Sequence, residues 1–513
     1  MESEGYPEKP HDASAHGGFS SADTVPSSSS LLRKSQVSLY NDDSSCSSES
    51  SSPAHSSRKE EKLLQKWLRR LLQFFKHMRA RLSSFLSRLC KGWTPARRKW
   101  ALRLLCLGAA ALYLRSFFSD AHQTYTGDWG PTWLYKLMLA AFPPLTALLG
   151  RRWGGFKADE RATFDRQMML AWHPHGVVPV GAFNYAGPFC GREGRPVNFF
   201  ALVASAVFSI PGIRESMLVF NARSADKKTL DHMLSHGKSV ALNPGGIHEL
   251  CRTNHKREVA YFPPNLGQFR AALRHGVPIV PCYLFGENQT YVTTDASRAL
   301  MTKTYKLFGL PVLLGWGRWG LPFLPYIKGD ISVRVGVPVE VPEKPQGELR
   351  EDLTGRDVAE LFAKYLLTLQ DLFDREAHVC LPADVAARGL LLLYRLPKRK
   401  KGESVDPAVS SVIDSPGGVM ELRPNAKTNE VVLLRSGAKG PGEDSTEVAR
   451  MAVGPDGCVT GSGLLLMSAL IDMAGSPGKK EKKGKKGQKE KKALSVDAEA
   501  RSSGRPQAAS ARL

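Results

Sequence analysis

Residues 168–176 form the stretch MMLAWHPHG, an apolar run followed by a polar turn. Five successive apolar residues predict a buried strand that ends at Trp172. The turn His173-Pro174-His175-Gly176 follows directly, and reactive side chains gather at such strand ends because the sheet is rigid while the loop can face a ligand. A histidine whose pKa lies near neutrality can accept the proton of an attacking hydroxyl. His173 and His175 are therefore candidate catalytic residues, with a solvated loop or metal ligation as the alternatives.

Apolar strands and amphipathic helices alternate on both sides of this stretch, from about residue 160 to 380. This alternation is typical of an α/β fold. We expect a mixed sheet flanked by helices, in a domain over residues 153–385. The predicted strands are 168–172, 197–203, 217–220, 239–242, 279–285 and 331–335, and the predicted helices are 227–234, 266–275 and 358–373, the last beginning at Thr354.

A second polar block, Asn243-Pro244-Gly245-Gly246-Ile247-His248-Glu249, follows the strand predicted at 239–242. The N–H groups of Gly245 and Gly246 can donate to a developing oxyanion, and Glu249 can hold an imidazole in one tautomer. Gly176 in the first turn allows the backbone to approach a substrate, while Pro174 restricts that turn. The alternative for Gly245 and Gly246 is a tight turn before a helix.

The N-terminal third predicts membrane association. Residues 1–58 are rich in serine and too poor in apolar side chains to fold, so we expect disorder. Residues 59–99 have the spacing of a basic amphipathic helix, which lies in a headgroup layer or docks on the protein's own core. Two apolar runs within 100–152 predict a membrane hairpin whose outer ends, flanked by basic residues, are cytosolic. Two buried helices of a soluble domain are the alternative.

Charge and cysteine content limit the partners. With 71 Lys and Arg against 49 Asp and Glu, the net charge is +22, which requires an anionic lipid surface, a phosphorylated ligand or nucleic acid. Residues 386–513 predict a low-complexity basic tail, in which only 390–394 and 461–473 are apolar enough to pack or touch membrane. This tail lacks interleaved aromatics, so nucleic acid is the weakest option. The eight cysteines have no spacing typical of zinc or disulfides, and no metal is expected.

Several motifs together resemble the diacylglycerol acyltransferase type 2 family, which includes monoacylglycerol and wax-alcohol acyltransferases. They are 173–176, the Gly-Gly-x-x-Glu block ending at Glu249, and 269–276 running on to Phe285-Gly286-Glu287-Asn288. The resemblance extends from the apolar hairpin to Leu381 and implies a fold like that of the glycerolipid acyltransferases. The chain departs from the family in lacking a basic stretch at 263–268 and in its tail. It also has Val180 where the broader class has aspartate after the histidine, so the resemblance implies another acid, Glu249.

The resemblance further implies an enzyme that transfers an acyl group from acyl-CoA, its co-substrate, to diacylglycerol without another cofactor. His175 would be the general base oriented by Glu249, and His173 would shape the loop or share the proton. Arg223 would meet CoA phosphate, and Pro174 and Arg270 would contact substrate.

Alternatives to this function are acylation of monoacylglycerol or a long-chain alcohol, and an inactive scaffold that tethers lipid. A lipid substrate predicts the endoplasmic reticulum membrane, with a cytosolic catalytic domain, and lipid droplets as a second location. The oligomeric state is open and includes a homo-oligomer.

Overall fold

The structure of the 513-residue chain is a computed structural model. It describes single residues between 69 and 88, and then residues 92–138, 153–182, 199–321, 325, 330–342, 349–399, 405–414, 418–436 and 445–475. The predictions for residues 1–58, for most of the basic helix before residue 92, for 139–152 and for 476–513 lie outside these ranges.

A seven-stranded mixed sheet, in the order β1-β8-β7-β2-β5-β3-β4, forms the centre of the predicted domain. Its strands are β1 (Trp153–Ala158), β2 (Met169–His173), β3 (Phe199–Val203), β4 (Arg223–Ser224), β5 (Ser239–Leu242), β7 (Ile279–Phe285) and β8 (Ile331–Val335). β7 and β8 pair antiparallel, while the other neighbours pair parallel. The α/β mixed sheet is thus confirmed.

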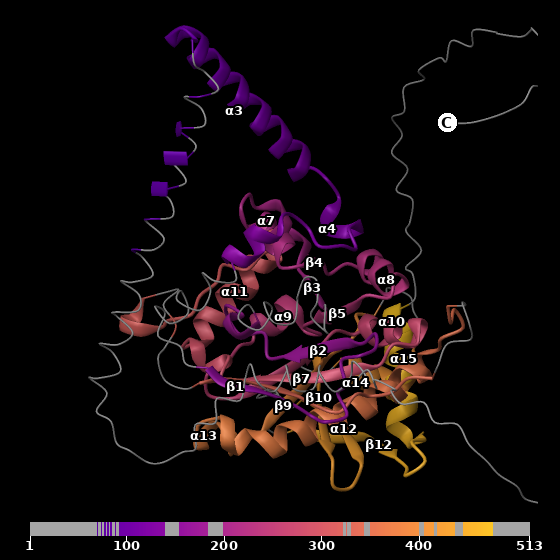
Figure 1. The fold of residues 1–513 in the computed structure, drawn as a ribbon. Helices are drawn as coiled ribbons and strands as arrows, with labels where there is room; N and C mark the ends of the chain where they lie inside the picture. Colours follow the sequence, from indigo (N-terminus) through magenta and orange to yellow (C-terminus); the bar gives the residue numbers. More distant parts are fainter. Residues whose placement is uncertain are drawn as a thin grey trace, which may run out of the picture. The chain divides into compact units, whose positions relative to one another are not determined.

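Helices cover this sheet, and Figure 1 shows α7 on one side of it and α12 on the other. The helices of this part are α7 (Ile213–Val219), α8 (Lys227–Ser235), α9 (Gly246–Leu250), α10 (Gly267–His275), α11 (Asp295–Phe308), α12 (Gly355–Cys380) and α13 (Ala383–Ala386). Short 3₁₀ helices are η1 (Ser205–Ser209), η2 (Asn288–Thr290) and η3 (Arg318–Gly320). The Thr354 side chain accepts a hydrogen bond from the Asp357 N–H and caps α12, as its position predicted.

The strand predicted at 217–220 is wrong, because 217–219 form the last turn of α7. A short apolar run has the same composition in a buried strand and in one face of a helix, so periodicity could not separate them.

A second sheet joins the core to the C-terminal region, with the order β13-β12-β11-β10-β9-β6. Its strands are β6 (Glu258–Phe262), β9 (Leu390–Arg395), β10 (Val419–Asn425), β11 (Glu430–Arg435), β12 (Thr446–Val453) and β13 (Val459–Thr460), and α14 (Pro407–Ile413) and α15 (Ser462–Gly475) accompany it. The prediction of a low-complexity tail from residue 386 is therefore wrong as far as residue 475. Its strands are short and separated by polar loops, which hid their alternation.

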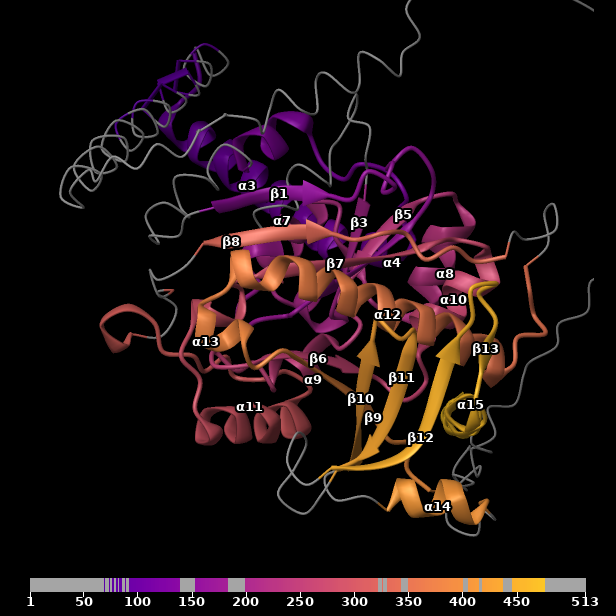
Figure 2. The same cartoon turned by 90° about the horizontal axis from the view of Figure 1, so that it is seen from below.

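α12 contacts strands of both sheets, and Figure 2 shows it running between β8 and the ends of β10–β12. Leu366 of α12, Leu433 of β11 and Met467 of α15 belong to one buried cluster. The described residues between 387 and 475 thus complete the hydrophobic core of the predicted domain, and residue 385 is no structural boundary.

The apolar N-terminal region contributes one long helix, α3 (Pro95–Phe117), followed by α4 (Ala121–Thr124). Within the described ranges, α3 is the one helix long and apolar enough to cross a membrane, and its leucines are exposed. Residues 132–138 are also helical, and Tyr135 packs there on Val219 and Phe220. The rest of the predicted hairpin falls on 139–152, so the described residues show one apolar helix and no hairpin.

Candidate active site

His173 ends β2, between the parallel neighbours β5 and β7. Side chains alternate along β2, so Met169 and Ala171 join the cluster around α12 while Leu170 and Trp172 face the opposite side. His173 follows the first pair: it is fully buried and meets Phe262 edge-on at 5.3 Å. Its Nδ1 lies 2.9 Å from Oε2 of Glu249, to which a neutral ring donates.

Glu249 in α9 is the centre of this arrangement. Its Oε2 accepts from His173 Nδ1 and from the N–H of Tyr261 (2.9 Å), and its Oε1 accepts from the N–H of His175 (2.8 Å) and from Nδ2 of Asn243 (2.9 Å). Burial alone would raise the pKa of this carboxyl, but His173 and these donors lower it below its ordinary value. Glu249 is therefore a buried carboxylate that organises the turn after β2.

His175 joins this network through its backbone N–H alone, and its side chain is half-buried. Its Nδ1 donates to the Gly176 carbonyl oxygen at 3.0 Å, and its ring lies 5.6 Å from that of Trp172. Burial lowers the pKa of His175, so the ring is neutral near pH 7. Glu249 holds the backbone of His175 and the ring of His173. The expectation that Glu249 orients the His175 ring is thus corrected.

An apolar cavity of about 120 Å³ lies against the Trp172 side of the first sheet. Side chains on the Leu170 and Trp172 face of the sheet supply much of its wall. Residues from α7 and from the turn after His175 supply the rest. It is lined by Leu170, Trp172, Pro179, Ala182, Phe199, Ala201, Leu202, Val203, Met217, Phe220, Ala222, Ala241, Cys282, Leu284, Val333 and Val335. His175 lies beside this cavity through its contact with Trp172, whereas His173 faces the opposite layer.

The glycines predicted to support an oxyanion have other contacts. The N–H of Gly246 donates to Asn243 Oδ1, so it is not free for a substrate and that expectation is corrected. A Cβ at Gly245 would lie 2.5 Å from the Tyr261 carbonyl oxygen and 2.6 Å from Glu249 Cβ. Gly176 has φ +68° and packs on Glu287, whose Cγ would be 2.8 Å from a Cβ. Gly245 and Gly176 thus permit close packing around the two glutamates.

Two further buried glutamates were not predicted as site residues. Glu287 accepts from the N–H groups of Val180 (2.9 Å) and Gly181 (2.7 Å), and so holds the turn after His175. Glu258 in β6 accepts from Tyr283, Asn288 and Gln289 at 2.7, 2.9 and 2.7 Å. Burial raises the pKa of Glu258 to about 7. The segment Phe285-Gly286-Glu287-Asn288 was the only sequence signal for this network.

The predicted substrate-binding residues are separated from each other. Arg223 is fully buried and donates to three backbone carbonyls, those of Tyr125 (2.6 Å), Gly127 (2.7 Å) and Ala222 (2.8 Å). It therefore ties the segment after α4 to the sheet, which corrects its predicted contact with phosphate.

Arg270 donates to the Leu353 carbonyl at 2.8 Å and lies 3.9 Å from Asp472 of α15, so it links α10 to the C-terminal helix and not to the histidines. Pro174 is buried between the two histidines.

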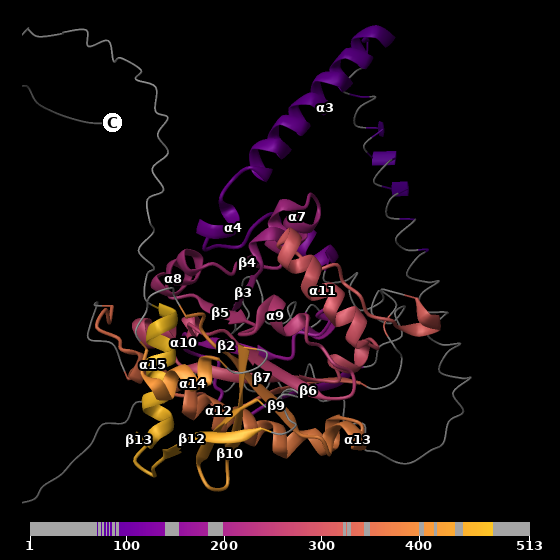
Figure 3. The same ribbon diagram turned by 180° about the vertical axis from the view of Figure 1, so that it is seen from behind.

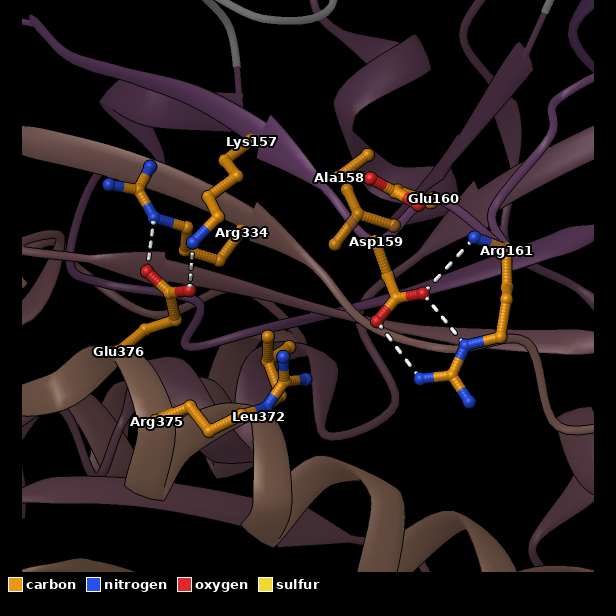
Figure 4. A pocket seen from close by; sticks show the side chains of 10 residues that line it. Lys157, Ala158, Asp159, Glu160, Arg161, Arg334, Leu372, Arg375 and Glu376 are labelled. Carbon is orange, nitrogen blue, oxygen red and sulfur yellow. Dashed lines mark hydrogen bonds and ion pairs between the residues drawn. The ribbon is translucent and has the colours of Figure 1, made fainter.

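A polar pocket elsewhere is formed by β1, β8 and α12 (Figure 4). Two of its carboxylates form ion pairs within it: Glu376 pairs with Lys157 at 2.8 Å and Arg334 at 2.9 Å, and Asp159 pairs with Arg161 at 2.9 Å. None of the predicted site residues lines it. Across the described ranges, no group of three His, Cys, Asp or Glu side chains is arranged to hold a metal ion.

The fold and the histidine turn beside an apolar cavity define an α/β protein equipped for chemistry on apolar molecules. The family model of diacylglycerol acyltransferase matches residues 99–386. The chain, matched over more than half its length, belongs to the diacylglycerol acyltransferase family.

Relatives at modest identity agree with this family. Human 2-acylglycerol O-acyltransferase 3 is 29% identical and is aligned over 42% of this chain and 66% of its own length. Diacylglycerol O-acyltransferase 2 of Xenopus tropicalis is 29% identical, over 54% of this chain and 82% of its own. The chain thus spans about two thirds of the length of the first of these relatives. Among solved structures, the 1-acyl-sn-glycerophosphate acyltransferase of Thermotoga maritima has a TM-score of 0.29 at 14% identity, covering 52% of this chain and 90% of that one.

Proposed function

We propose that the chain is an acyl-CoA-dependent O-acyltransferase that converts diacylglycerol to triacylglycerol in storage-lipid synthesis. One observation carries the proposal beyond family membership: the half-buried ring of His175 lies against Trp172, which lines the apolar cavity. A hydrogen-bonding imidazole at the wall of an apolar cavity suits the transfer of a fatty acyl group, because the chain needs an apolar site and the hydroxyl needs a base.

In the proposed reaction, Nε2 of His175 accepts the proton of the alcohol as its oxygen attacks the thioester carbonyl. The tetrahedral intermediate collapses, the C–S bond breaks, and the thiolate of CoA takes the proton back from the imidazolium. The bond from Nδ1 to the Gly176 carbonyl supports this role, since it leaves Nε2 of the neutral ring as the acceptor. The lowered pKa of His175 keeps that ring neutral.

The pair of His173 and Glu249 is proposed to position this turn. Glu249 accepts hydrogen bonds from both the ring of His173 and the backbone N–H of His175, so a change at His173 or Glu249 would move His175, the proposed base. His173 remains a candidate to share the proton, because Nε2 is buried and has no hydrogen-bond partner among the described residues. Of the expected oxyanion donors, the N–H of Gly245 is left for that role.

Membrane attachment is proposed through α3 and through α11. Figure 3 shows α11 beside α9, and Met301 of α11 packs with Leu250 of α9. On the same helix, Leu307 and Phe308 are exposed, as are the basic residues Lys303 and Lys306. Exposed apolar side chains beside lysines suit the interface of a bilayer. We infer an endoplasmic reticulum membrane protein with a cytosolic catalytic domain, also present on lipid droplets, whose acceptor enters from the bilayer.

The test is acyl transfer from labelled acyl-CoA to diacylglycerol, in microsomes that lack this activity, for wild type, His175→Ala, His173→Ala and the control His378→Ala. His378 is exposed on α12, so its loss should leave activity unchanged. Loss of at least about a hundredfold in His175→Ala, at normal expression and membrane association, is expected of a missing general base. A fully active His175→Ala with an inactive His173→Ala would move the base to His173 and reject the mechanism above.

A second candidate is acylation of monoacylglycerol, favoured by the human 2-acylglycerol O-acyltransferase relative. Competition between monoacylglycerol, diacylglycerol and a long-chain alcohol as acceptors separates these activities. A wild-type protein that binds microsomes yet acylates none of the three would support the inactive lipid-tethering scaffold.

A further inference from the structure

Two arginines from distant parts of the chain contact His248 of α9. Nη1 of Arg395, the last residue of β9, lies 3.0 Å from Nε2 of His248 and donates to it. Arg252 donates to the His248 carbonyl at 3.0 Å and stacks over the ring of Tyr261 at 4.2 Å. His248 directly precedes Glu249, so this arginine pair adjoins the candidate active site.

The pair forms a site of uncompensated positive charge. Both arginines are half-buried, and no carboxylate in the described part of the chain lies within ion-pair distance of either one. His248 adds no negative charge, and Glu249 is occupied by His173. Burial first, and then Arg395 and Arg252, lower the pKa of His248 to about 4, so His248 accepts from Arg395 as a neutral ring. Two cations held together without a counter-ion favour the binding of an anion.

Guanidinium groups match the geometry of phosphate oxygens and bind them through two parallel hydrogen bonds. Arg395 is followed by the exposed Lys398 and Arg399, which extend the positive surface. We propose that Arg252 and Arg395 bind a phosphate group of the CoA moiety while the thioester lies at the histidine turn. This inference rests on the proposed function, since it assigns the donor of that reaction to this site.

The origin of Arg395 gives the C-terminal sheet a role in the reaction. The family match ends at residue 386, and β9 begins at Leu390. β9 is held in place by parallel pairing with β6, where Tyr394 is the partner of Phe262. The neighbouring Tyr261 donates its N–H to Glu249, and the guanidinium of Arg252 lies over its ring. The added sheet therefore completes a binding site of the family domain.

The test compares full-length wild type, Arg252→Gln, Arg395→Gln and the control Arg388→Gln in microsomes. Arg388 is an exposed arginine just before β9, so it matches the chemical change outside the site. Each site variant is expected to raise the KM for acyl-CoA about tenfold, as for the loss of a charge-assisted phosphate contact, with the KM for the alcohol and kcat unchanged. Arg395→Lys, which keeps the charge, is expected to recover part of this loss.

Two further measurements decide what the arginines bind. The KM of each variant is measured with acyl-CoA and with acyl-3′-dephospho-CoA, and again at several contents of anionic lipid. A KM effect that depends on the phosphate of the donor supports the proposal. An effect that follows only anionic lipid overturns it in favour of a headgroup site, and site variants that match Arg388→Gln overturn it outright. Binding of adenosine 3′,5′-bisphosphate to the purified protein separates the proposal from the reaction. Weaker binding by Arg395→Gln supports the phosphate site even if no acyl transfer is found, whereas equal binding overturns it.

Discussion

Replacing Glu249 by glutamine tests the network that holds the histidine turn. The carboxylate accepts four hydrogen bonds, two at each oxygen. An amide offers one oxygen, so its NH₂ group must face a pair of donors in either orientation. With NH₂ in the place of Oε2 it meets His173 and Tyr261, and in the place of Oε1 it meets His175 and Asn243.

Neighbouring groups offer little relief from these clashes. Rotating the Asn243 amide would break the hydrogen bond that the Gly246 N–H donates to its Oδ1. Moving the His173 proton to Nε2 would leave that N–H buried without a partner in the described structure. About two buried hydrogen bonds are therefore lost, at about 1–3 kcal/mol each, for a total of about 4 kcal/mol. At about 2–4 °C per kcal/mol, the melting temperature should fall by about 10 °C.

The assay is thermal unfolding of purified full-length protein in detergent, followed by tryptophan fluorescence, with Glu258→Gln as the matched control. Glu258 is equally buried, but its Oε1 faces only Gln289, whose amide can rotate to present oxygen with the loss of one long bond, 3.3 Å, to the His255 carbonyl. At about pH 5, below the raised pKa of Glu258, Glu258→Gln should therefore melt within about 2–3 °C of wild type. If Glu249→Gln also melts in that range, Glu249 does not hold the turn and its assigned positioning role is refuted.

Four further predictions follow from the same contacts. The pKa of Glu258 rises from 4.5 to about 7 on folding, so the folded state binds more protons than the unfolded state in that interval. The free energy of unfolding should therefore fall by about 3 kcal/mol as the pH rises between these values. Urea titrations check this change against Glu258→Gln, whose stability should lack it. Gly245→Ala places a Cβ 2.5 Å from the Tyr261 carbonyl and should lower the melting temperature, unlike Gly267→Ala, where the nearest atom is 3.8 Å away; equal melting would contradict the packing. Shortening the chain to residue 386 removes Leu433 and Met467 from the core around α12 and should yield aggregates in size-exclusion chromatography, whereas a chain ending at 475 should stay monodisperse. Arg223→Met breaks three buried bonds to backbone carbonyls and should reduce thermal stability without raising the KM for acyl-CoA; a selective KM effect would restore its phosphate role.

Local patterns were sufficient for the main elements of the domain. The run before His173, the strand before Asn243 and the amphipathic face of α12 each carry their own periodicity, and the Thr354 cap depends on neighbours three residues apart. The two polar blocks were placed at strand ends by the apolar runs before them, whereas their proximity comes from the parallel pairing of β2 with β5, whose carboxyl ends meet at one edge.

Contacts between distant segments could not be inferred in the same way. Glu249 lies 76 residues from His173 and 74 from His175, and nothing in that spacing says which ring it meets. The alternation of side chains along β2 decides which ring Glu249 contacts, because it places His173 on the same face as Met169 and Ala171, next to Phe262. The partners of Arg223 could likewise not be inferred from the sequence, because the carbonyls of Tyr125 and Gly127 that it binds lie nearly a hundred residues earlier.

By itself, the sequence determined that this is an α/β domain with paired histidines and a glutamate block at strand ends, attached to an apolar N-terminal region. The tertiary structure decided that Glu249 holds the His173 ring, that residues 387–475 belong to the core, and that Arg395 reaches α9. The physical reason is the pairing of β9 with β6, two strands more than a hundred residues apart, which no local pattern records.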